Sequence, residues 1–161
     1  MERISKTNYY LDIAQTVAKR GTCLRRKFGS IIVKNDTIVS TGYAGAPRGR
    51  ANCSDLQYCQ REKMQIPRGE RYELCRAVHS EANAIISASR ETMLGADLYL
   101  VCINPFDDSI VAGTCSCQMC KKLIINAGIS RVIVRETIDL YTVYDVNDWV
   151  TNDDSLGTIG Y

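Results

Sequence analysis

Residues 97–134 read DLYLVCINPFDDSIVAGTCSCQMCKKLIINAGISRVIV, and their pattern indicates the fold class. Asp97–Ile103 has a central run that is apolar on both faces, which predicts a buried central strand. A helix over about residues 117–126 follows, with Gly128 placed to end it as a left-handed cap. Arg131–Val134 then predicts another strand. A strand, a helix and a strand, with further helices before and after, predict a layered α/β domain with a mixed sheet.

The N-terminal part of the chain predicts one helix and one hairpin. Apolar residues recur at three- and four-residue steps from Thr7 to Lys19, with Gly21 just past the end, which is typical of an amphipathic helix. Phe28–Val33 and Ile38–Tyr43 are rich in residues that favour strands, and they are joined around Asn35-Asp36. We expect these two strands to form the antiparallel edge of the sheet.

The remaining segments are less regular. A helix is expected over Ser80–Arg90, and a short one over Asp145–Thr151. Residues 155–161 predict a final edge strand or a loose tail. Residues 44–75 have no sustained period, and a loop of this length is far beyond the usual ~4 to 6 residues, which indicates either a function or a hidden constraint. We therefore expect a single domain over residues 1–161 with a long cysteine-containing loop at about 44–75.

Composition narrows the function classes. A chain of 161 residues is long enough for a real hydrophobic core. Its net charge of +2 is spread over interleaved acidic and basic residues, which argues against binding long nucleic acid. The first residues do not resemble a secretory leader, and about 18 apolar residues never run together, so we expect a cytoplasmic protein without a membrane span. In that compartment eight cysteines favour metal binding over disulfides.

Two short motifs carry the chemistry, namely His79-Ser80-Glu81 and Cys117-x-x-Cys120. One imidazole and two thiolates suit a tetrahedral zinc ion, and three protein ligands leave the fourth position open for water. Zinc lowers the pKa of that water to about 7, and Glu81 is the expected carrier of the released proton. A redox pair or half of a structural zinc site would also fit Cys-x-x-Cys, but would leave His79 and Glu81 unexplained.

The spacing supports a metal site. Cys117 and Cys120 lie on one face of a helix, and a helix start favours thiolates. His-x-Glu followed by Pro-Cys-x-x-Cys is the signature of zinc nucleobase deaminases. Here Ser116 stands where proline is usual, which removes no ligand and allows serine to cap the helix start instead.

A second metal site is predicted within and beside the long loop. Cys53, Cys59 and Cys75 lie within it and Cys23 lies just before the first strand. Four thiolates bound to one structural zinc would keep the loop ordered, since the loop has no hydrophobic core of its own to do so. The alternative is that some of these cysteines are small buried residues.

Residues 23–33 (CLRRKFGSIIV) and 41–49 (TGYAGAPRG), together with the two zinc motifs, resemble the deoxycytidylate (dCMP) deaminases of the cytidine deaminase superfamily. The resemblance spans about residues 7–134. It implies a three-layer α/β/α fold with a mixed sheet of about five strands. It also implies hydrolysis of dCMP to dUMP with release of ammonia, in pyrimidine nucleotide metabolism. It further implies a homo-oligomer, often a hexamer, with dCTP and dTTP as effectors.

Carried over by position, the resemblance makes His79, Cys117 and Cys120 zinc ligands and Glu81 the proton shuttle to N3 and the amino group. Some family members hold a second zinc at positions that match Cys23 and Cys53. The chain departs from the family at Ala44, where the family has an asparagine that hydrogen-bonds the nucleotide. The candidate substrate contacts are Ala44, Gly45, Arg48 and Ser116.

Arg48 is a candidate phosphate contact because Pro47 introduces it rigidly and its planar fork can donate two hydrogen bonds. The loss of the asparagine leaves other substrates open, namely another cytosine nucleotide, a nucleoside or a tRNA base. A non-catalytic nucleotide-binding module is a further alternative, although its mark would be a missing ligand or a missing Glu81. All four residues are present.

Overall fold

Strand β3 (Asp97–Ile103) lies in the middle of a five-stranded sheet, as its two-sided apolar run predicts. The computed structural model describes residues 1–157 of the chain. The strands are arranged in the order β2-β1-β3-β4-β5, and only the β3–β4 pair is parallel. The sheet is therefore mixed. The other four strands are β1 (Lys27–Lys34), β2 (Thr37–Tyr43), β4 (Arg131–Arg135) and β5 (Tyr141–Asp145), of which β2 and β5 are the edges.

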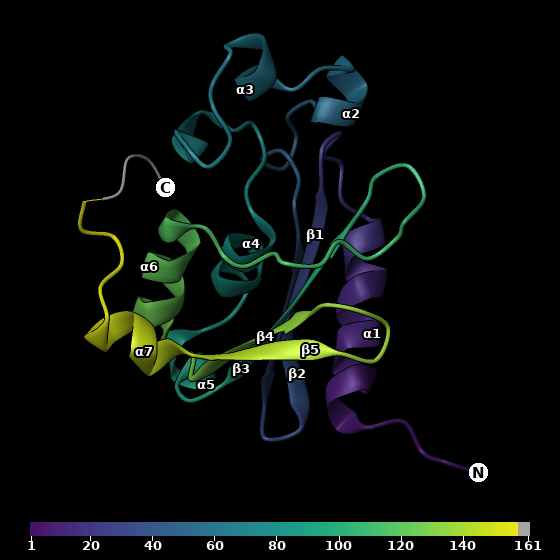
Figure 1. The fold of residues 1–161 in the computed structure, drawn as a ribbon, viewed down its shortest axis with the longest axis vertical. Helices are drawn as coiled ribbons and strands as arrows, with labels where there is room; N and C mark the ends of the chain where they lie inside the picture. Colours follow the sequence, from purple (N-terminus) through teal and green to yellow (C-terminus); the bar gives the residue numbers. More distant parts are fainter. Residues whose placement is uncertain (158–161) are drawn as a thin grey trace.

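Helices cover both faces of this sheet (Figure 1). Helix α1 (Lys6–Lys19) packs on one face, and α4 (Ser80–Ile86) and α6 (Gln118–Ala127) pack on the other. The alternation along β3 explains why, since Leu98 and Leu100 belong to the core under α4 and α6, whereas Tyr99, Val101 and Ile103 belong to the core under α1. The expected three-layer α/β/α fold is confirmed. Short helices α5 (Arg90–Met93) and α7 (Val146–Thr151) complete the second layer.

One glycine in the hairpin allows the helix that begins at Ser80 to approach the sheet. A Cβ atom on Gly42 would lie 2.3 Å from the backbone oxygen of Ser80 and 2.4 Å from the backbone nitrogen of Ala84. A side chain at this position would push α4 away from β2. Gly42 therefore fixes where the start of α4, and with it the first motif, lies above the sheet.

The helix expected over Ser80–Arg90 is wrong in its length. Helix α4 ends at Ile86, and α5 starts at Arg90 with Ser89 as its N-cap. The Ser89 hydroxyl accepts a hydrogen bond from the Thr92 backbone N–H at 3.3 Å. Serine side chains that bond local backbone groups favour helix starts over helix interiors, which explains the break.

Strand β5 was missed by the sequence pattern. It is an edge strand whose side chains alternate only between exposed and half-buried, so its apolar periodicity is weak. The short helix expected over Asp145–Thr151 is confirmed as α7, with Asp145 as its N-cap. The expected strand or tail at 155–161 lies mostly outside the described residues, and residues 155–157 form a turn.

The long loop after β2 contains only short elements. These are α2 (Cys53–Leu56), α3 (Gln60–Lys63) and the 3₁₀ turn η1 (Tyr72–Leu74). The loop returns to the sheet through two backbone hydrogen bonds between Gly45 and Val78. Within residues 1–157, no helix is long and apolar enough to cross a membrane.

Candidate metal centre

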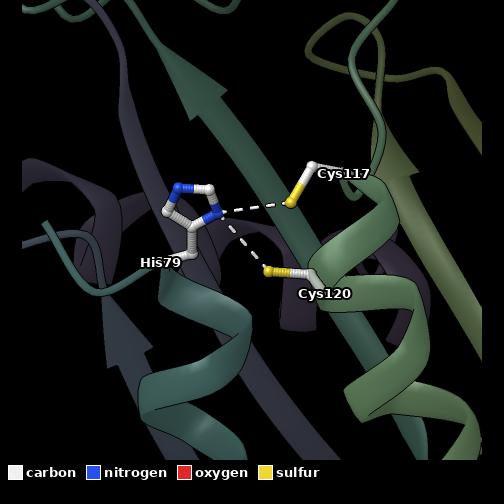
Figure 2. Close-up of side chains that lie close together, drawn as sticks. All are labelled: His79, Cys117 and Cys120. Atoms are coloured by element: carbon white, nitrogen blue, oxygen red, sulfur yellow. Dashed lines mark hydrogen bonds between the residues drawn. The ribbon is translucent and has the colours of Figure 1, made fainter. Parts of the chain in front are cut away.

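His79, Cys117 and Cys120 come together at the adjacent starts of α4 and α6 (Figure 2). His79 and Cys117 are the N-cap residues of these helices, and Cys120 lies in the first turn of α6. The Nδ1 atom of His79 lies 3.5 Å from the Sγ atom of Cys117 and 3.4 Å from that of Cys120. The two motifs, 38 residues apart in the sequence, therefore form one cluster.

The segment before α4 is held in place by the hairpin. Val78 pairs with Gly45 through hydrogen bonds of 3.2 and 2.7 Å. The Asn83 side-chain amide donates to the backbone oxygen of Tyr43 at 2.8 Å and to that of Val78 at 3.3 Å. His79 thus lies between the paired residue Val78 and the first turn of α4, and both neighbours are held in place, which restricts where its imidazole can lie.

The electrostatics of the cluster favour a charged thiolate. Burial lowers the pKa of His79, but hydrogen bonds with Cys117 and Cys75 outweigh it and raise that pKa to about 10. The hydrogen bond with Cys120 lowers the pKa of Cys117 to about 4, against the effect of burial. The same bond, together with burial, raises the pKa of Cys120. Of the two thiols, Cys117 is therefore the more acidic when the cluster holds no metal.

The donor set fits zinc. The ligand atoms of His79, Cys117 and Cys120 all lie within 4.8 Å of one another, and within residues 1–157 no other set of three or more His, Cys, Asp or Glu side chains does so. One nitrogen and two sulfurs are the ligands that zinc prefers, and three protein ligands are typical of a catalytic zinc ion. These three residues would hold the metal.

Glu81 lies beside the cluster without belonging to it. Its side chain is 4% exposed and lines the same cavity as His79 and Cys117. The Ser80 hydroxyl donates to its Oε1 atom at 2.9 Å, and the Ser30 hydroxyl lies 2.7 Å from that of Ser80. A buried carboxylate that is oriented but not bound to the metal is what a proton carrier requires.

A cavity of about 260 Å³ opens onto the cluster. Its wall contains four arginine side chains, and Glu81 is the one acidic residue among the described residues that line it. The cavity is therefore a positively charged pocket around a metal site, which suits a small anionic ligand. The arginines are Arg25, Arg26, Arg61 and Arg68.

The candidate substrate contacts fall in different places. Ala44 is buried and lines the cavity, and Gly45 is buried beside it in the pairing with Val78. Ser116 is buried but does not line the cavity. Arg48 is exposed and does not line it either. Their contacts with a substrate stay predictions, and the position of Arg48 gives no support to its predicted role.

Sequence reasoning missed most of the arginines on the cavity wall. Arg61 and Arg68 come from the loop, where no periodicity marks which side chains point inward. Arg25 and Arg26 come just before β1, and their closeness to Cys23 in a conspicuous motif was the available signal. Thr114, which also lines the cavity, carried no such signal.

The four cysteines predicted to hold a second zinc lie near one another but do not reach ligand spacing. Burial raises the pKa of Cys53, and the nearby thiols of Cys23, Cys75 and Cys59 raise it further. No three of their sulfur atoms lie within 4.8 Å of one another. The second zinc site therefore stays a prediction.

Comparison with known proteins agrees with the geometry. The family profile described as "Cytidine and deoxycytidylate deaminase zinc-binding region" matches residues 4–136. The deoxycytidylate deaminase of Mycobacterium phage D29 is 37% identical over 137 residues, which cover 83% of this chain and 96% of the phage protein. The deoxycytidylate deaminase of Schizosaccharomyces pombe is 30% identical over 138 residues, or 86% of this chain. The matched region spans only 39% of the length of that yeast protein.

A solved structure shows the same fold. The crystal structure of dCMP deaminase from the cyanophage S-TIM5 in apo form aligns with a TM-score of 0.57 and 25% identity, over 86% of this chain and 88% of that one. The three-layer fold, the His-Cys-Cys cluster and the sequence matches all point to one family. This chain belongs to the cytidine and deoxycytidylate deaminase family.

Proposed function

We propose that this chain is a zinc-dependent deaminase that converts dCMP to dUMP with release of ammonia. The observation that carries the proposal is the cavity in which the His79, Cys117 and Cys120 cluster, the buried carboxylate of Glu81 and several arginines meet. The deoxycytidylate deaminase of phage D29, which this chain matches over nearly its whole length, supports dCMP as the substrate.

The reaction replaces the C4–N bond of cytosine by a C4–O bond and needs one water molecule. Zinc, when bound, would act as a Lewis acid that activates water at neutral pH. Glu81 takes one proton from that water and passes it to N3 of the ring as the water oxygen bonds to C4. Glu81 then moves the second proton of that oxygen to the amino group, the C4–N bond breaks, and ammonia leaves behind a C4 carbonyl. The Ser80 hydroxyl donates to one carboxylate oxygen of Glu81 at 2.9 Å, which orients the carboxylate for proton transfer.

The arginines account for the phosphate of a nucleotide. Arg26 is half-buried on the cavity wall, and its Nη1 atom donates to the backbone oxygen of Arg25 at 3.3 Å. Arg25 is already paired with Glu62 at 3.0 Å. Guanidinium groups bind phosphate in a fork geometry, so we assign Arg26 as the main phosphate contact in place of Arg48.

Replacing Arg26 by alanine should lower kcat/KM on dCMP roughly tenfold or more, in line with about 1.5–3 kcal/mol for a hydrogen bond to a charged group. Activity on deoxycytidine, which has no phosphate, should change little. Arg48→Ala is the matched control because it removes an exposed arginine outside the cavity. A loss on dCMP in Arg48→Ala but not in Arg26→Ala would instead place the phosphate at residues 45–49.

One assay tests the substrate as a whole. Ammonia release should be measured with cytidine, deoxycytidine, dCMP, CMP, dCTP and a tRNA anticodon loop. The proposal expects the highest kcat/KM on dCMP. Preference for the nucleoside or for the RNA would overturn the substrate and leave the deaminase chemistry standing.

The second zinc is part of the proposal. Cys53 is buried and lies within electrostatic reach of the other three thiols, which supports a shared structural metal. Elemental analysis should then return about two zinc ions per chain, one of which survives in His79→Ala. A single zinc in protein purified without chelators would contradict the site. The four cysteines are Cys23, Cys53, Cys59 and Cys75.

Assembly and regulation also belong to the proposal. A homo-oligomer, in the form of a hexamer, and control by dCTP and dTTP are what the resemblance implies. Edge strand β5 supports assembly because Tyr141 and Val143 expose 41% and 46% of their surface there. The molar mass in solution and the response of the rate to each triphosphate measure these two properties.

A further inference from the structure

Arg61 is a buried cation inside the long loop. Only 4% of its surface is exposed, and within residues 1–157 it forms no ion pair with a carboxylate. Its Nη2 atom donates to the backbone oxygen of Pro67 at 2.8 Å and to that of Glu70. These two hydrogen bonds hold the guanidinium in place, while its buried Nε atom has no hydrogen-bond partner among the described residues. Arg61 closes the segment from α3 to residue 70.

Arg61 is also connected to the metal cluster, through the ring of Tyr72. Its Cζ atom lies 4.4 Å from the centroid of the Tyr72 ring, in a cation–π contact. The Tyr72 ring in turn meets the His79 ring edge to face, with centroids 5.3 Å apart and planes at 76°. The contacts therefore run without a break from two backbone carbonyls of the loop to the imidazole of a metal ligand.

The helix of His79 does not orient its imidazole, and the support comes from the long loop, where Cys75 has a hydrogen bond with the imidazole and Tyr72 packs on it. As N-cap of α4, His79 makes no side-chain hydrogen bond to the helix backbone. Its Nδ1 atom faces Cys117 and Cys120, and the second ring nitrogen points away from both (Figure 2). Metal-binding histidines are usually oriented by partners on the side away from the metal, and losing such a partner typically costs about 10- to 100-fold in metal affinity.

We infer that Arg61 and Tyr72 are positioning residues that hold the His79 imidazole toward Cys117 and Cys120. Through them the long loop is connected mechanically to the metal centre. The inference rests on the proposed metal site but not on the identity of the substrate. It makes zinc affinity depend on a residue that touches no metal ligand directly.

The chain offers a direct spectroscopic test because His79 is its only histidine. The ring nitrogens of zinc-loaded protein therefore give a single set of imidazole ¹⁵N signals, whose positions report the tautomer and the metal contact. Arg61→Met removes the guanidinium and leaves Tyr72 in place. We expect those ¹⁵N signals to shift and broaden, and zinc affinity in competition with a chelator to fall about tenfold.

Two comparisons keep the test specific. Tyr58→Leu is the matched control, because Lys63 Nζ lies 4.6 Å from the centroid of the Tyr58 ring in the same loop. It removes a contact of the same kind and should change neither zinc affinity nor the His79 signals. Tyr72→Phe keeps the ring and should resemble the wild type, whereas Tyr72→Leu should weaken zinc binding about as much as Arg61→Met.

The two positioning residues act in series, so their effects should not add. The double variant Arg61→Met, Tyr72→Leu should bind zinc about as weakly as either single variant, whereas independent effects would multiply. If Arg61→Met fails to fold, the Tyr72→Phe and Tyr72→Leu pair decides the question alone. Zinc affinity within twofold of wild type in Tyr72→Leu, with unchanged His79 ¹⁵N signals, would overturn the inference.

Failure of the inference can be told apart from failure of the proposed function. Zinc affinity and the His79 signals are measured without substrate. A protein that shows the expected loss in zinc affinity but does not deaminate dCMP would keep the positioning role and lose the substrate. A protein that deaminates dCMP, but whose zinc affinity is unchanged in the Arg61 and Tyr72 variants, would keep the proposed function and lose the positioning role.

Discussion

Glu81→Gln should keep the fold and the zinc content but lose nearly all deaminase turnover. Glutamine has the same shape and can still accept the hydrogen bond that the Ser80 hydroxyl donates at 2.9 Å. It cannot take up and release a proton, and a positioned general acid–base group typically contributes about 10²- to 10⁴-fold to the rate. Because Glu81 lies outside the His79, Cys117 and Cys120 cluster, metal binding should be unaffected.

Steady-state kinetics on dCMP, with zinc measured on the same sample, check this result. A fall in kcat with little change in KM is expected, since the carboxylate acts on the reacting atoms and not on the bulk of the substrate. Ser80→Ala is a useful companion because it leaves the carboxylate but removes its hydrogen bond, so it should cost less. Activity of Glu81→Gln within threefold of wild type would remove Glu81 from the proton-transfer role.

Cys117→Ala should lose zinc and activity together. Two ligands remain after this change, and a catalytic zinc ion held by three protein ligands does not tolerate the loss of one. Cys117 would bind zinc as a thiolate, as would Cys120, so the change also removes a negatively charged ligand. Removing this charged ligand should therefore weaken zinc binding more than removing a neutral ligand would.

Cys115→Ala is the matched control for this change. Cys115 lines the same cavity two residues earlier but does not belong to the cluster, and burial raises the pKa of its thiol. Its replacement should leave bound zinc unchanged. Zinc content has to be compared at a single chelator concentration so that a second metal site does not mask the loss. Unchanged zinc in Cys117→Ala and lost zinc in Cys115→Ala would reverse the ligand assignment.

The elements that could be predicted are those with a strong local pattern. Strand β3 has the expected bounds because a continuous apolar run marks it. Helix α1 begins one residue earlier than expected, and its apolar side chains recur with the helical period. Helix α4 was predicted too long because the serines at 87 and 89 mark a break only when their hydrogen-bond partners are known. Strand β5 was missed because an edge strand buries too little to impose a period.

The sequence by itself determined which residues are the candidates for the metal centre. On a helix, Cys117 and Cys120 share one face, and together with His79 and Glu81 they match the signature of zinc nucleobase deaminases, so the candidate ligands and the free carboxylate could be named from short motifs alone.

Only the tertiary structure decided what surrounds that centre. The sheet order brings α4 and α6 side by side, and the long loop folds back to place Arg61 on Tyr72 and Tyr72 on His79. The residues in these contacts do not belong to a common helix or strand pattern. Arg61 is held by backbone carbonyls, which every residue has, and Tyr72 contacts its neighbours through its ring, so the sequence does not mark either partner. For this reason the sequence pointed to Arg48 as the phosphate contact, whereas the folded structure places Arg26, and not Arg48, on the cavity wall.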